Sequence, residues 1–136
     1  MDEVRAYVAE REPDMIILTE TWTNEDIQDE YLVIKGFDMT VREDRKDTRG
    51  GRGGGILVYA RKEIDVWRDK GCEEFNQMVT VKIGGGGQEV AVHVIYRSPN
   101  SSRSNDEELN KWVKTLSGRF IIIGDMNYPG IQWENG

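Results

Sequence analysis

Apolar and polar residues occur along the chain in short blocks, and each block predicts one helix or strand. Residues 2–12 carry three apolar side chains at helical spacing and stop at Pro13, which predicts a short amphipathic helix. These side chains are Val4, Tyr7 and Val8. Residues 14–21 form a continuous apolar run with a polar end, a pattern typical of a strand buried on both faces.

The middle and the end of the chain show further apolar runs that predict strands. Residues 36–41 and 56–62 are two of them, and a polar loop separates the two. Residues 76–97 contain two runs on either side of four consecutive glycines, which predicts a β-hairpin with a flexible glycine turn. A last apolar run at 119–124 predicts one more strand.

Residues 105–117 carry the clearest helical pattern of the chain. Their apolar side chains recur at i, i+3, i+4 and i+7 and form one stripe. The stripe consists of Leu109, Trp112, Val113 and Leu116. Asn105 and Glu108 predict a capping box at the start of this helix, and Gly118 is predicted to end it.

The mixture of helices, a hairpin and continuous apolar strands predicts the α+β class, built as a layered α/β sandwich. With 136 residues and no repeat, the chain is predicted to be one domain, residues 1–136. Its 38% hydrophobic and 32% charged residues are ordinary for a soluble globular chain. The charged N-terminus does not resemble a signal peptide, and no apolar run approaches the about 18 residues of a membrane span. We therefore expect an intracellular protein that is neither secreted nor embedded in a membrane.

The net charge of −7 counts mildly against a general nucleic-acid-binding module, because such modules are usually basic. Carboxylates that bind a cation would explain the negative net charge, although surface acids for solubility are the commoner cause. The loop at 42–52 departs from this balance, with five basic and three acidic residues. It is a candidate strip for a phosphate backbone, with Arg52 as the expected substrate contact, and a solvated loop is the alternative.

Three of the predicted strands end in polar side chains. Glu20 ends the first, Tyr96 ends the hairpin, and Asp125 and Asn127 follow the last. Residues two apart on an extended chain leave on the same side, so Asp125 and Asn127 are predicted to face one way. If these strands are neighbours, two carboxylates, a carboxamide and a phenol share one pocket, a set that suits Mg²⁺. The alternative is that each is a solvated residue at a turn, and the pattern alone leaves both open.

Four segments, in this order and at these spacings, resemble the endonuclease/exonuclease/phosphatase superfamily. The segments are PDMIILTETW, GGGILVYARK, VIYRSPNSS and IIIGDMNYPGIQW. Within the superfamily they look most like the endonuclease domains of non-LTR retrotransposons of the LINE and jockey types. The resemblance covers residues 10–134, and it implies a sandwich of the DNase I-like type.

The resemblance also implies a role for each polar strand end. Glu20 matches a metal-binding glutamate, and Tyr96 matches a tyrosine that contacts the scissile phosphate. Asp125 matches the aspartate that positions or activates the attacking water, and Asn127 the asparagine beside it that holds phosphate and water. Asn100, which closes the string Tyr-Arg-x-Pro-Asn, is expected to bind substrate.

The reaction implied by the resemblance is hydrolysis of phosphodiesters with Mg²⁺ or Mn²⁺. In the retrotransposon branch the substrate is DNA, which is nicked to leave a 3′-hydroxyl for reverse transcription, so a nuclear location is expected for such a product. RNA is the alternative nucleic acid. The chemistry agrees, because a cation and hydrogen-bond donors neutralise charge on the phosphoryl oxygens while a carboxylate orients water.

The chain departs from the superfamily pattern toward both ends. An N-terminal asparagine, a second aspartate and a closing Ser-Asp-His string have no match, and His93 lies mid-strand, where we expect a structural role. We therefore expect an incomplete sandwich with an open apolar sheet face, covered by a second chain or a further segment, and little hydrolysis by these residues alone. The alternatives are a non-catalytic remnant that only binds its ligand and a phosphatase of the same superfamily.

Overall fold

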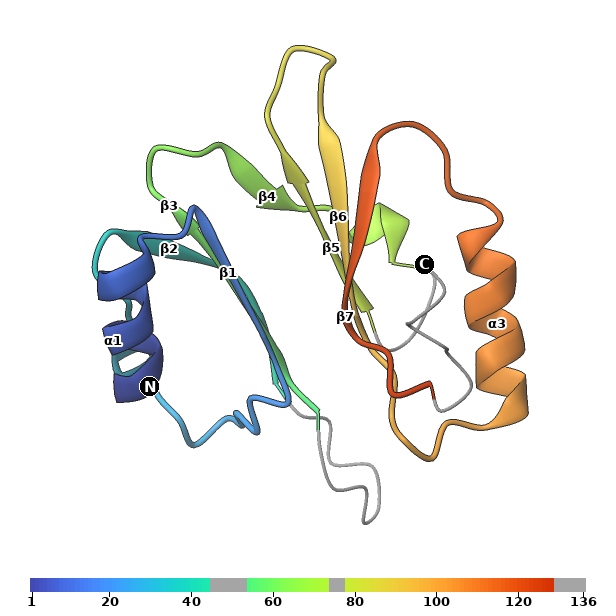
Figure 1. Ribbon diagram of the computed structural model, residues 1–136, viewed down its shortest axis with the longest axis horizontal. Helices are drawn as coiled ribbons and strands as arrows, with labels where there is room; N and C mark the ends of the chain where they lie inside the picture. Colours follow the sequence, from blue (N-terminus) through green and yellow to red (C-terminus); the bar gives the residue numbers. More distant parts are fainter. Residues whose placement is uncertain (45–53, 74–77, 129–136) are drawn as a thin grey trace.

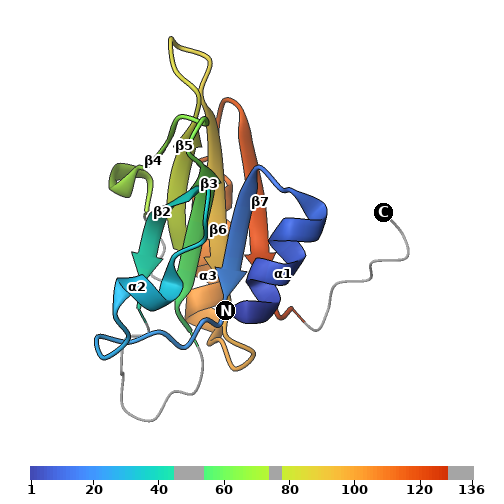
Figure 2. The ribbon, with the colours of Figure 1, turned by 90° about the vertical axis from the view of Figure 1, so that its left-hand side faces the viewer.

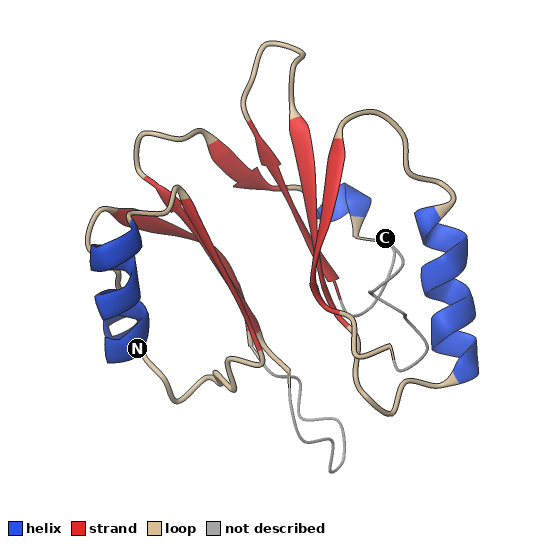
Figure 3. Cartoon of the chain, viewed as in Figure 1, coloured by secondary structure: helices blue, strands red, loops and turns tan. Residues whose placement is uncertain are grey.

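Two β-sheets face each other, and a helix covers the outer side of each (Figure 1). The computed structural model describes residues 1–44, 54–73 and 78–128. Figure 3 shows the same layers by secondary structure, with strands inside and the two longer helices outside. The mixed α+β class and the layered sandwich predicted from the sequence are therefore confirmed.

The first sheet has the strand order β1-β3-β2, and both pairs of neighbours are antiparallel. Its strands are β1 (Met15–Thr19), β2 (Phe37–Glu43) and β3 (Ile56–Arg61). Helix α1 (Asp2–Arg11) packs on its outer side, and the short helix α2 (Asp29–Leu32) precedes β2. The predicted strands at 14–21, 36–41 and 56–62 are all present.

The second sheet has the order β4-β5-β6-β7, and it contains one parallel pair, β6 with β7. Its strands are β4 (Val66–Arg68), β5 (Met78–Ile83), β6 (Val90–Tyr96) and β7 (Phe120–Asp125). A 3₁₀ turn, η1 (Lys70–Cys72), separates β4 from β5, and the predicted hairpin is formed by β5 and β6. Parallel strands need a crossover, which helix α3 (Arg103–Val113) supplies between β6 and β7.

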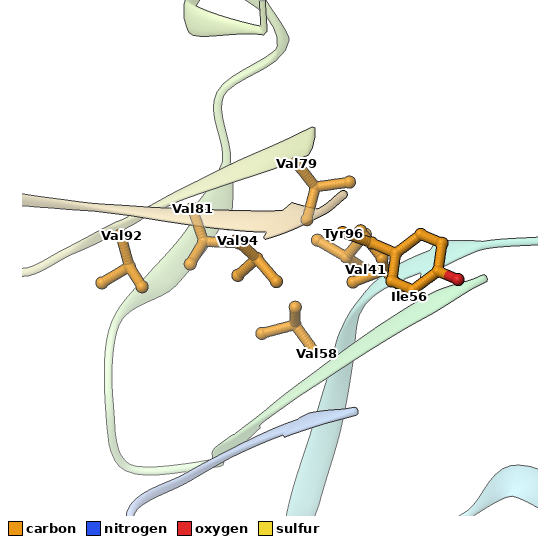
Figure 4. Packing of buried hydrophobic residues seen from close by; sticks show 8 residues of the cluster. All are labelled: Val41, Ile56, Val58, Val79, Val81, Val92, Val94 and Tyr96. Atoms are coloured by element: carbon orange, nitrogen blue, oxygen red, sulfur yellow. The ribbon is translucent and has the colours of Figure 1, made fainter. Parts of the chain in front are cut away.

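The main core lies between the two sheets and is built largely from β-branched side chains (Figure 4). Its buried members are Val41, Ile56, Val58, Val79, Val81, Val92, Val94 and Tyr96. Alternation along each strand sends every second side chain into this layer, so the other side chains face the helices. Smaller apolar clusters accordingly lie under α1 and under α3.

Strand β1 corrects one prediction from the sequence. The run at 14–21 was predicted to be buried on both faces, but all five residues of β1 are only partly buried. The reason is position, because β1 lies at the edge of its sheet among the described residues. The predicted apolar side of α1 is also narrower than expected, since Val8 is buried and Tyr7 is exposed.

The start of helix α3 corrects a second prediction from the sequence. The predicted capping box of Asn105 and Glu108 is wrong, because the helix begins earlier and Ser102 is its N-cap. The Ser102 hydroxyl accepts a hydrogen bond from the Asn105 backbone N–H at 3.2 Å. In the predicted apolar stripe, Leu109 and Trp112 are buried, whereas Val113 is exposed.

Strand β7 is an edge strand of the second sheet within the part of the chain that the structure describes, and it contacts β1, the edge strand of the opposite sheet. Figure 2 shows both strands from the side that carries α1. Ile121 and Ile123 of β7 pair with Val92 and Val94, so they share the inner face of the sheet, but they are exposed. An open apolar sheet face was expected from the sequence, and among the described residues β7 is where it occurs. No helix in the described ranges is both long and apolar enough to cross a membrane.

Candidate active site

The carboxyl ends of β1, β6 and β7 lie at the same end of the molecule, the lower end in Figure 1. In the parallel pair, Tyr96 is the partner of Asp125, so both side chains leave on the inner face. The backbone pairing continues past the strand end, because the Arg97 N–H donates to the Asp125 carbonyl at 2.8 Å. Tertiary structure thus places Tyr96 next to Asp125, as the neighbouring-strand interpretation required.

Glu20 enters from the opposite sheet. Its carboxylate accepts a hydrogen bond from the Tyr96 hydroxyl, across 76 positions of sequence. Tyr96 is only 7% exposed, whereas Glu20 is exposed at the end of β1. This contact joins the two sheets and leaves the carboxylate within reach of a ligand.

The environment of Tyr96 raises the pKa of its phenol to about 12. Burial is the main cause, and the hydrogen bond to Glu20 and the charges of Glu20 and Asp125 add to it. At neutral pH the hydroxyl is therefore protonated and acts as a donor. The single O–H of Tyr96 donates to Glu20 in this structure, so it can donate to a phosphate oxygen only after it leaves Glu20.

Alkaline titration should reveal this environment. A tyrosine with a pKa of 10.0 when unfolded and about 12 when folded binds its proton more tightly in the folded state. The free energy of unfolding is therefore expected to fall as the pH rises from about 10 to about 12. Ultraviolet titration of phenolate absorbance in the wild type and in Tyr96→Phe assigns the late transition. Glu20→Gln should lower the Tyr96 pKa only in part, since burial remains, and a Tyr96 that ionises near 10.0 would contradict this account.

The loop after β1 is held against the start of β3 by two glycines. The Thr21 and Trp22 backbone N–H groups donate to the carbonyls of Gly55 and Gly54, at 3.4 and 3.1 Å. A Cβ on Gly55 would lie 2.4 Å from the Thr21 hydroxyl oxygen, so a side chain does not fit there. Glu20 itself has a positive φ of 52°, a conformation that needs such support in a non-glycine residue. The glycine run, read from the sequence as a loop, therefore positions Glu20.

The turn after β7 differs from the prediction. Asp125 and Asn127 were predicted to face one way on an extended chain, but Asn127 has a φ of 40°, so the chain turns there. The Asn127 N–H donates to the Asp125 carboxylate at 3.2 Å, and the Asn127 side-chain amide donates to the Arg97 carbonyl at 2.9 Å. Asn127 thus braces the turn and the Asp125 carboxylate rather than lying parallel to it.

The remaining predicted residues fall outside this cluster. Asn100 is exposed in the turn between β6 and α3, and its predicted substrate contact stays a prediction. Arg52 lies outside the described residues. Arg42, at the start of the same basic loop, binds Asp44 at 2.8 Å and Asp29 at 2.5 Å, so it anchors neighbouring loops.

His93 points to the opposite face of β6 from Tyr96. Its Nδ1 lies 2.9 Å from the Thr80 hydroxyl oxygen, and its ring meets Trp112 edge-on with centroids 5.0 Å apart. Burial lowers the pKa of the imidazole. These contacts agree with the structural role expected from its mid-strand position.

Hydrolysis of a phosphodiester, the reaction expected from the sequence, would need a divalent cation. Among the described residues, no three His, Cys, Asp or Glu side chains are grouped closely enough to hold a metal ion. Mg²⁺, however, is usually bound by one or two carboxylates, with water and phosphate oxygens as its other ligands. An exposed Glu20 carboxylate near Asp125 fits such a site.

Comparison with known proteins identifies the family. The model of the Endonuclease/Exonuclease/phosphatase family matches residues 1–135. A search of curated proteins finds no match.

Several solved structures share the fold. The endonuclease domain of TRAS1, a telomere-specific non-LTR retrotransposon, aligns with a TM-score of 0.61 and 18% identity over 94% of this chain and 54% of its own. The AP endonuclease LMAP from Leishmania major aligns with a TM-score of 0.67 and 19% identity, over 91% and 49%. Humanised D. rerio TDP2 aligns with a TM-score of 0.55 and 15% identity, over 95% and 55%. The chain thus spans about half the length of the structures it matches, and at these identities the likeness establishes the fold.

Proposed function

Because the chain belongs to the endonuclease/exonuclease/phosphatase family, we propose that it carries a site for hydrolysis of phosphodiester bonds in DNA. The observation that carries the proposal is the contact between Tyr96 and Glu20, which joins the two sheets beside Asp125. Two carboxylates, which suit a cation and a water molecule, and one phenol, which can donate to a phosphate oxygen, thus lie at one end of the sandwich. Two of the similar structures are an endonuclease domain and an AP endonuclease, which supports DNA as the substrate.

Each residue of the site has a distinct part in the proposal. The Glu20 carboxylate would hold Mg²⁺, or Mn²⁺ in its place, and the cation when bound supplies positive charge for the phosphoryl oxygens. With the Glu20 carboxylate on the cation, the protonated Tyr96 hydroxyl would exchange its hydrogen bond to Glu20 for one to a nonbridging phosphate oxygen. Asp125, held by the Asn127 N–H, would orient a water molecule for attack on phosphorus. Asn100 and Arg52 stay as the proposed substrate contacts.

A cation titration tests the proposal. Mg²⁺ or Mn²⁺ added to the wild-type chain, followed by NMR and calorimetry, should give saturable binding with shifts at residues 20, 96 and 125. Glu20→Gln and Asp125→Asn remove one negative charge each, so each is expected to weaken binding by more than about tenfold. Glu63→Gln, at an exposed turn between β3 and β4, is the matched control and should bind like the wild type.

Nicking of supercoiled DNA in the presence of Mg²⁺ then separates hydrolysis from binding. Cation binding that depends on Glu20 and Asp125, with nicking that both variants abolish, supports the proposed reaction. Cation binding without nicking would favour a module that binds its ligand without turnover. Binding that is indifferent to both substitutions would refute the site.

A further inference from the structure

Arg97 is a buried cation beside the candidate active site, at the end of β6. Arg97 as a whole is only 4% exposed. Its Nε and one terminal nitrogen donate to the two oxygens of Asp106, at 2.7 and 3.0 Å. Its other terminal nitrogen donates to the Asn127 carbonyl at 2.6 Å, and the Tyr128 ring lies 4.4 Å from the guanidinium carbon. We call these four residues the Arg97 cluster.

The bonds between Arg97 and Asn127 run in both directions. The Arg97 guanidinium donates to the Asn127 carbonyl, and the Asn127 side chain donates to the Arg97 carbonyl. Asn127 keeps a positive φ of 40°, which is unfavourable without such contacts. Since the Asn127 N–H in turn binds the Asp125 carboxylate, the Arg97 cluster is one bond away from the proposed water-orienting group.

Asp106 ties the same cluster to helix α3 and the preceding loop. The Ser101 hydroxyl donates to the Asp106 carboxylate at 3.0 Å, and the Asn105 side-chain amide donates to the Ser101 hydroxyl at 2.7 Å. The loop at 98–102, which carries Asn100, is therefore held to the first turn of the helix. One guanidinium links this loop to the turn at 125–128.

We propose that Arg97 is a positioning residue of the candidate active site, which holds Asn127 and hence the Asp125 carboxylate in place from a buried ion pair with Asp106. The positioning role rests on the proposed function, whereas the contacts from Arg97 to Asp106 and Asn127, and from Asn127 to Asp125, are features of the fold itself. Arginine is needed because its planar fork donates in several fixed directions at once. A lysine keeps the charge but is a single point donor.

Arg97→Lys is the decisive variant, and Asp106→Asn is the second. Both retain side chains of similar size, so that folding need not be lost. Arg68→Lys is the matched control, because Arg68 also binds a carboxylate with two nitrogens, to Glu73 at 2.8 and 2.9 Å, but lies on β4 away from the site. The readouts are hydrogen exchange of the Asn127 N–H, the thermal midpoint, and Mg²⁺ affinity.

In Arg97→Lys and Asp106→Asn, the Asn127 N–H is expected to exchange at least about tenfold faster, as the loss of a charge-assisted hydrogen bond implies. Mg²⁺ affinity should fall with it, whereas Arg68→Lys should lower the thermal midpoint without changing either local readout. Unchanged exchange at Asn127 in both cluster variants would overturn the inference. Equal changes in Arg68→Lys would do the same, because they would indicate a general loss of stability. If the wild type binds no Mg²⁺, the proposed function fails, while the exchange data still decide the positioning role.

Discussion

Gly124→Ala is expected to lower the free energy of unfolding by about 3–5 kcal/mol, from backbone strain and overpacking together. Gly124 has a φ of 137°, a conformation that side-chain-bearing residues rarely adopt. A Cβ at this position would lie 1.9 Å from the Ile95 carbonyl oxygen, in the strand that pairs with β7. Alanine must therefore push β7 away from β6 at the place where Tyr96 and Asp125 meet. Urea denaturation followed by fluorescence measures the effect.

Gly118→Ala is the control for backbone conformation alone. Gly118 also has a positive φ, of 80°, but a Cβ there meets no atom within 4 Å. We expect it to cost about 1–2 kcal/mol, the penalty of a left-handed conformation without a clash. If Gly124→Ala cost no more than Gly118→Ala, the close approach of β7 to Ile95 would be refuted. The glycine of the Gly-Asp-x-Asn string is thus explained by strand pairing, and the aspartate after it by its position at the strand end.

Trp112→Ala is expected to destabilise the protein by about 3–5 kcal/mol, the range for removing a buried large aromatic side chain. Trp112 is 5% exposed and packs with Met78, Ile95 and Leu109, which attach α3 to the outer face of the second sheet. Its loss should also loosen the start of α3, which carries Asp106. Thermal and urea unfolding, monitored by circular dichroism, give the magnitude.

Val113→Ala is the neighbouring control on the same helix. Val113 is 39% exposed, so its truncation should change the free energy of unfolding by about 0.5 kcal/mol or less, as for most surface substitutions. If the two substitutions destabilised the protein equally, the contact of α3 with the sheet through Trp112 would be wrong. Weaker protection of the Asn127 N–H in Trp112→Ala would further connect the helix to the site.

Local patterns were sufficient to predict most elements. The strands at 36–41, 56–62 and 119–124, and the hairpin at 76–97, follow from short hydrophobic runs flanked by turn residues, a combination that favours extended chain. The predictions of burial that failed depended on neighbours, whereas the capping box failed because the helix begins at a nearby serine. Tyr7 is exposed on α1 although its spacing fits an apolar stripe, because what covers a helix face is decided by distant residues.

The candidate site was likewise predictable from the sequence only in part. Glu20, Tyr96 and Asp125 could be selected from sequence, because each polar side chain follows an apolar strand. The role of Arg97 was missed, since its partners Asp106 and Asn127 lie 9 and 30 positions away. An arginine at the end of an apolar strand, with an aspartate at the start of the next helix, is the signal that could have indicated the pair.

By itself, the sequence determined the two longer helices, every strand except the short β4, the mixed α+β class, and the polar residues at the strand ends. These features depend on periodicity and on contacts near in the chain. Tertiary structure alone decided that Tyr96 meets Glu20 across the two sheets, that Asn127 turns back to Arg97, and that Gly124 lies against Ile95. The physical reason is that strand order, sheet packing and the direction of a turn depend on contacts between distant segments, which a local pattern of residues does not encode.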